Sequence, residues 1–209
     1  DAGPLSHAVR PHKYKEINNF YTATVYEKGA EIIRMLKIIA GEKIYKKALQ
    51  QYFSKHDGKA STVEDLQEIF EDCLGMNLSN FFNWYEEKGT PKLRVLEQYG
   101  HGIYEATITQ EIISSRDKNN CKVIPIVYSI MSHKGEEIVG PTLLVHDKPK
   151  KTISLKYKKE KPTLSLFKGF SAPVIVEFKQ SAGDLKNILS NEKDFTSIWL
   201  AKDKLDYLC

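Results

Sequence analysis

Histidine and cysteine are the residues of this sequence that most readily bind metals or act as nucleophiles. The six histidines, none of them four residues from another, are His7, His12, His56, His101, His133 and His146. No His-Glu-x-x-His occurs, so the helical pattern that places two zinc ligands on one face is missing. We therefore expect no metal site built from this chain, and we interpret each histidine as a loop or surface residue.

Other catalytic patterns are also missing. The sequence has no Gly-x-Ser-x-Gly segment, phosphate loop or dinucleotide-binding fingerprint. The three cysteines, Cys73, Cys121 and Cys209, are odd in number and have no C-x-x-C spacing. They predict free thiols in a reducing compartment, which indicates a cytoplasmic location.

A cluster of seven lysines lies between Asp147 and Lys161. Lysines in a row can bind phosphates, which makes nucleic-acid binding one hypothesis. However, Thr152 to Lys158 alternates between polar and apolar residues, so the lysines divide between two faces or flank a strand. Lysine on an edge strand also prevents sheets from pairing edge to edge. We therefore favour the edge-strand interpretation and do not expect a nucleic-acid partner.

The elements that must position any functional side chain change in type near residue 90. Before that point, apolar residues recur at helical spacing and predict helices that stop at Gly41, near His56, at Gly75 and at Gly89. The third helix opens with Ser61-Thr62-Val63-Glu64, a capping-box pattern. The first 90 residues thus predict an antiparallel helical array.

Alternating patterns after Pro91 predict a small antiparallel β-sandwich. The expected strands include Leu93–Val95, 104–109, 123–130, 142–145, 152–157 and 174–178. From Gly183 the spacing becomes helical again, with an apolar stripe that includes Phe195 and Trp199. The fold class is therefore a multidomain α + β arrangement of helices, sandwich and further helices.

The 209 residues carry a net charge of +4 and contain no apolar run of the length that spans a membrane. The segment from Asp1 to Pro11 has neither an initiator Met nor the pattern of a signal peptide. We therefore expect an internal segment of a longer protein.

The segment from Glu16 to Met35, EINNFYTATVYEKGAEIIRM, closely resembles the helix that follows the zinc site in the aminopeptidase N family. This family is the alanyl-aminopeptidase branch of the gluzincin zinc metallopeptidases. Ser6–Pro11 is similar to its approach segment, with two substitutions. Further similar motifs follow in the same order: Tyr52-Phe53 with His56-Asp57-Gly58, Trp84-Tyr85 with Gly89-Thr90-Pro91, and 167–174.

This resemblance implies three regions. Residues 1–91 would be the C-terminal helices of a thermolysin-like catalytic domain, 92–181 a β-sandwich domain, and 182–209 the first helices of a C-terminal helical domain. The one zinc ion of the parent enzyme would be held by ligands located before this chain begins. The implied partners are peptide substrates and the remaining domains of the same polypeptide.

The resemblance also implies roles for three residues. Tyr26 matches the tyrosine that donates a hydrogen bond to the oxyanion of the tetrahedral intermediate. Tyr21 matches a tyrosine of the pocket for the first side chain, and Asn18 lies close to the same substrate site. Glu27, Lys28, Glu31 and Arg34, in contrast, are expected to support the helix through i,i+3 and i,i+4 pairs.

Two classes of function therefore remain open. The favoured one is part of a zinc aminopeptidase that removes N-terminal amino acids from peptides, with the isolated segment inactive. The alternative is a non-catalytic interaction or scaffold module descended from the family.

Overall fold

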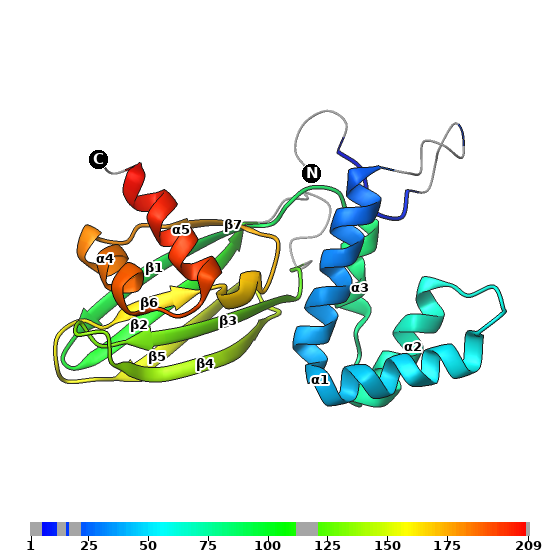
Figure 1. Ribbon diagram of the computed structural model, residues 1–209, viewed down its shortest axis with the longest axis horizontal. Helices are drawn as coiled ribbons and strands as arrows, with labels where there is room; N and C mark the ends of the chain where they lie inside the picture. Colours follow the sequence, from blue (N-terminus) through cyan, green and yellow to red (C-terminus); the bar gives the residue numbers. More distant parts are fainter. Residues whose placement is uncertain (1–5, 12–15, 17–21, 112–120, 208–209) are drawn as a thin grey trace. The chain divides into compact units, whose positions relative to one another are not determined.

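The computed structural model describes residues 6–11, 16, 22–111 and 121–207, which belong to two compact units (Figure 1). The first unit extends to Thr90 and is helical, and the second begins at Pro91 and contains both sheets. Within the described residues, no helix is long and apolar enough to cross a membrane.

The helical unit begins with a π-helical turn, η2 (Thr24–Lys28), which continues directly into α1 (Gly29–His56). It is followed by α2 (Val63–Leu74) and α3 (Ser79–Glu86). Gly41 interrupts α1 with φ 72° and ψ 160°, a conformation that glycine adopts without the steric cost of a side chain. The predicted end of a helix at Gly41 is therefore a kink between two helical halves.

The cap of α2 lies one residue later than the sequence pattern predicted. The side chain of Thr62 accepts the N–H of Asp65, and the Asp65 carboxylate accepts the N–H of Thr62. Ser61 is not the cap residue, and its hydroxyl lies 2.6 Å from that of Tyr52. Glu64 pairs with Arg10 rather than with the cap. The sequence contains two overlapping S/T-x-x-D/E patterns, one starting at Ser61 and one at Thr62. The second forms the cap, while Ser61 and Glu64 of the first contact Tyr52 and Arg10 instead.

The core of the helical unit is aliphatic on α1 and aromatic on α3. Ile32, Met35 and Leu36 of α1 are fully buried, as are Phe81 and Trp84 of α3. Between α1 and α2, the rings of Tyr45 and Phe70 lie 5.7 Å apart. Phe53, near the end of α1, is in contrast 60% exposed.

The second unit contains a sandwich of two sheets. The four-stranded sheet has the order β5-β2-β1-β7 and the three-stranded sheet the order β4-β3-β6. Their bounds are β1 (Lys92–Gly100), β2 (Ile103–Glu111), β3 (Ile124–Met131), β4 (Glu137–His146), β5 (Lys150–Lys156), β6 (Thr163–Leu166) and β7 (Ile175–Phe178).

Two features of the sandwich differ from the prediction. Strand β6 was not predicted, because all four of its residues are buried and no alternation marks it. Strand β7 pairs with β1 in parallel, from Lys92↔Ile175 to Val95↔Phe178, whereas all other pairs are antiparallel. The sandwich is therefore antiparallel with one parallel edge pair.

Helices α4 (Ala182–Asn191) and α5 (Phe195–Asp206) cover one side of the sandwich (Figure 1). Leu185 and Ile188 of α4 and Ala201 of α5 form a buried cluster with Met131 of β3. The apolar stripe predicted for α5 is only partly buried, since Phe195 is 80% and Trp199 56% exposed. Small residues, Ser197 and Ala201, occupy the buried face of α5 instead.

His146 is fully buried between the two sheets, so its interpretation as a loop or surface residue was wrong. Its Nε2 donates to the carbonyl of Ile108 at 3.0 Å, and the Gln110 amide nitrogen lies 3.0 Å from its Nδ1. Burial lowers the pKa of this imidazole below its usual value. Complete hydrogen bonding is what allows the ring to lie in the core.

The lysine-rich strand β5 lies at the edge of its sheet, as the edge-strand interpretation requires. Lys151 pairs with Asp147 at 2.7 Å, and Lys161 bridges Glu97 and Asp184 at 3.0 and 3.1 Å.

Candidate active-site segment

Tyr26 lies in the middle of the π-helical turn that opens the helical unit, and 62% of its surface is exposed. π-Helical turns widen the backbone spiral, are rare, and occur frequently at functional sites. Tyr26 therefore lies outside the buried core of the described helical unit.

The backbone before Tyr26 is held by a short hydrogen-bond chain. His7 Nδ1 lies 2.7 Å from the carbonyl oxygen of Ala8, so this nitrogen carries the proton, because a carbonyl only accepts. In the neutral ring, Nε2 then accepts from the hydroxyl of Thr22 at 2.9 Å. The Thr22 oxygen in turn accepts the N–H of Val25 at 3.3 Å. This chain ties the approach segment to the turn that carries Tyr26.

Lys28 follows Tyr26 by two residues and is buried. Its ammonium donates to the carbonyl oxygens of Glu87 and Gly89 at 2.9 and 3.0 Å. Burial lowers the pKa of Lys28 to about 8, although the nearby Glu87 charge opposes this. Lys28 therefore connects the Tyr26 turn to the Gly89-Thr90 segment, a tertiary role that sequence reasoning missed. Nothing in the sequence around Lys28 indicated these tertiary contacts.

Among the other charged residues near Tyr26, Glu31 and Arg34 form the predicted i,i+3 pair, with Arg34 Nε donating to both Glu31 carboxylate oxygens.

Arg10 fixes the other end of the approach segment. Its guanidinium pairs with Glu64 of α2 and, at 3.5 Å, with Glu86 of α3. Its backbone N–H donates to the carbonyl of Tyr85 at 2.9 Å. The hydrogen bond and charge of Glu64 hold the pKa of Arg10 above its usual value. The approach segment, η2, α2 and α3 are thus connected within one unit.

Of the three residues predicted for the site, the structure describes only Tyr26. Asn18 and Tyr21 lie outside the described residues, so their roles stay predictions. Among the residues that are described, no three His, Cys, Asp or Glu side chains gather in a way that would hold a metal ion.

Two stretches of the chain match known protein families. Residues 1–85 match the peptidase family M1 domain, and residues 89–179 match a domain of unknown function with an Ig-like fold. The chain therefore contains part of a peptidase family M1 domain, followed by the Ig-like domain.

Its relatives include enzymes named aminopeptidase N. The chain is 38% identical to aminopeptidase N of Caulobacter vibrioides and 34% identical to that of Escherichia coli, in each case over 98% of the chain. It covers 24% and 25% of these two proteins, and so spans about a quarter of their length. A crystal structure of Legionella pneumophila aminopeptidase A in complex with aspartic acid is similar over 97% of this chain and 23% of that one, with a TM-score of 0.86 and 29% identity.

Proposed function

We propose that this chain is part of a zinc-dependent aminopeptidase that hydrolyses N-terminal amino acids from peptides, and that the enzyme is cytoplasmic. The family match and the names of the relatives support this activity. The observation that carries the proposal is the exposed Tyr26 on a π-helical turn inside the region that matches the peptidase domain.

Tyr26 would act on the negative charge that develops on the former carbonyl oxygen when water attacks the first peptide bond. A phenol is a neutral donor at pH 7, and its rigid side chain has few torsions to fix. Its hydroxyl would donate a hydrogen bond that is stronger to the oxyanion than to the substrate carbonyl. Such a donor lowers the barrier because it stabilises the transition state more than the ground state.

The metal ion would come from another part of the parent protein. The described residues of this chain do not provide a ligand set, and we propose ligands outside this chain. The chain's own contribution is to hold the phenol in place. The His7–Thr22–Val25 hydrogen bonds fix the backbone before it, and the contacts of Lys28 fix the backbone after it.

Asn18 and Tyr21 would lie beside the substrate's first residue. They precede Tyr26 in the same segment, and the resemblance alone supports their roles. They stay secondary to Tyr26 in this proposal.

We further propose that residues 1–91 belong to the catalytic domain, 92–181 to a sandwich domain and 182–209 to a following helical domain. Phe195 and Trp199 support the last assignment. They lie four residues apart on α5, so they share one helix face, and both are largely exposed. Such a face suits packing against the remaining domains of the same polypeptide.

The test is the substitution Tyr26→Phe in the intact parent protein. Removing one oxyanion donor should lower kcat by about 100- to 1,000-fold. Metal content, measured by atomic emission, should not change. Tyr52→Phe is the matched control, because it removes a hydroxyl from another tyrosine of the same unit and should leave kcat within about twofold. A Tyr26→Phe enzyme with unchanged kcat would refute the role.

The isolated 209-residue chain should not release the chromophore from an alanyl anilide, with or without added zinc. Zinc-dependent release by the purified chain would show that the chain itself holds the metal. It would refute the proposal that the metal ligands lie outside this chain.

A further inference from the structure

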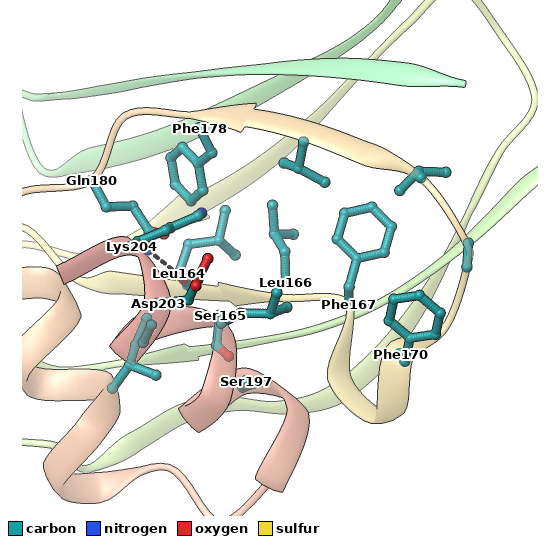
Figure 2. Close-up of a pocket in the computed structure, with 16 residues that line it drawn as sticks. Leu164, Ser165, Leu166, Phe167, Phe170, Phe178, Gln180, Ser197, Asp203 and Lys204 are labelled. Atoms are coloured by element: carbon teal, nitrogen blue, oxygen red, sulfur yellow. Dashed lines mark hydrogen bonds between the residues drawn. The ribbon is translucent and has the colours of Figure 1, made fainter. Parts of the chain in front are cut away.

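The second unit contains a cavity of about 320 Å³ between β6, β7 and α5 (Figure 2). Its wall is mostly apolar, with Leu164 and Leu166 of β6, Val176 and Phe178 of β7, and Leu200 of α5. Its volume lies at the lower end of the range of about 300–1,000 Å³ that is usual for small-molecule pockets.

The two ends of the cavity differ chemically. Figure 2 shows Gln180 and Lys204 at one end, and Phe167 and Phe170 at the other. Phe167 and Phe170 are held with φ 59° and 53°, in the left-handed region that bulky residues rarely adopt. The turn around Gly169 therefore fixes an aromatic end opposite a polar one.

Lys204 is the cationic group of the polar end, where Figure 2 also shows Asp203. Its Nζ donates to Gln180 Oε1 at 3.2 Å and lies 5.3 Å from the centre of the Phe178 ring. The Gln180 amide is itself oriented, because its Nε2 donates to the carbonyl of Leu164 at 3.1 Å. Lys204 is thus held in place by an amide and a ring.

No carboxylate among the described residues lies within ion-pair distance of Lys204, although Asp203 also lines the cavity and is exposed. Burial lowers the pKa of Lys204 below its usual value. An ammonium in a partly apolar site with no carboxylate at ion-pair distance is an unfavourable arrangement that an anion bound directly to it would relieve. Three donors on the ammonium, of which one is used by Gln180, leave capacity for a carboxylate.

We propose that this cavity binds a small apolar monocarboxylate of the medium-chain fatty acid type. The chain would lie along the leucines and valine toward Phe167, and the carboxylate would accept hydrogen bonds from Lys204. A neutral ligand of the same length would fill the apolar part but leave the ammonium unpaired. A cationic one would place like charges together.

The test is titration of the chain with octanoate, octanol and octylammonium, followed calorimetrically and through the methyl resonances of leucine and valine. Octanoate should bind with a Kd below about 1 mM and shift the methyls of Leu164, Leu166 and Val176. Octanol should bind at least about tenfold more weakly, and octylammonium more weakly still. Equal affinity for octanol and octanoate, or shifts confined to other parts of the chain, would overturn the proposal.

Two variants locate the site. Lys204→Met keeps the apolar stem and should weaken octanoate binding at least about tenfold, while leaving octanol binding unchanged. Lys202→Met, an exposed lysine on the same helix, is the matched control and should change neither. Val176→Trp should fill the cavity and weaken all the ligands together. Octanoate affinity that survives Lys204→Met would refute the role of the ammonium even if Val176→Trp fails to fold.

Discussion

The ion pair between Lys168 and Glu192 offers a direct test of how the turn after β6 is fixed to the helices. The side chains are 11% and 5% exposed, and Lys168 Nζ lies 2.6 Å from Glu192 Oε1. The same carboxylate oxygen accepts the N–H groups of Lys193 and Asp194 at 2.8 and 3.2 Å. The hydroxyl of Ser129 donates to the other oxygen at 3.3 Å. One carboxylate thus connects a strand, a turn and the α4–α5 connection.

Lys168→Met should lower the free energy of unfolding by about 2–3 kcal/mol. Removing one partner of a buried ion pair typically costs about 3–5 kcal/mol, because the other charge is left uncompensated. Here Glu192 keeps hydrogen bonds from two N–H groups and a hydroxyl, so its charge is partly compensated. The expected loss therefore lies below that range.

The pH dependence of this pair has a defined sign. Burial alone would raise the pKa of Glu192, but the Lys168 hydrogen bond, the two backbone N–H groups and the Lys168 charge hold it below its usual 4.5. A depressed pKa contributes stability above about pH 4.5 that is lost as the pH falls through the folded-state value. Without Lys168 the depression is smaller, so the difference between wild type and Lys168→Met should narrow below about pH 4.5.

Urea unfolding followed by circular dichroism measures both effects, and a double-mutant cycle with Glu192→Gln isolates the pair. The control is Lys186→Met, a lysine of α4 for which no ion pair is present among the described residues. A loss below about 1 kcal/mol for Lys168→Met, or a cycle with no coupling, would refute the reasoning.

Lys28 and Thr62 give two further predictions about stability. Because the pKa of Lys28 falls from 10.5 to about 8, the folded state loses its proton before the unfolded state does, and stability should rise between about pH 8 and 10.5. In urea unfolding across that pH range, the free energy of unfolding of the wild type should therefore rise relative to that of Lys28→Met. A difference between the two that does not change with pH would contradict the lowered pKa of Lys28. Thr62→Ala should cost about 1 kcal/mol of stability through loss of the α2 cap, whereas Ser61→Ala should cost less. Equal losses in thermal unfolding would mean that the capping box is not formed as described.

The sequence predicted the elements of this fold better than their details. Helical spacing correctly predicted the break at Gly41 and the end of α2 at Gly75. Both glycines adopt positive φ in the structure. The pattern could not choose between two overlapping capping boxes, since the choice depends on the tertiary partners of Ser61 and Glu64. It also missed β6, where burial on both faces removes the alternation that identifies a strand.

The candidate site was predicted from a resemblance and not from chemistry visible in single residues. Tyr26 was singled out in this way and its role stays a prediction, whereas the π-helical turn that carries it was not predicted. The role of Lys28 depends on the carbonyl oxygens of Glu87 and Gly89, which are 59 and 61 residues away in the sequence. Such partners carry no sequence signal, since every residue has a carbonyl group.

The parallel pairing of β1 with β7 has a consequence for the order in which the second unit forms. Strands β1 and β2 are adjacent in the chain, so their pairing closes a short loop, whereas β7 is more than 70 residues away from β1. During synthesis, β1 therefore emerges from the ribosome well before its second neighbour exists. Until residue 178 has been made, the sheet keeps an open edge at β1, and this interval is when the nascent chain is most exposed to pairing with another molecule.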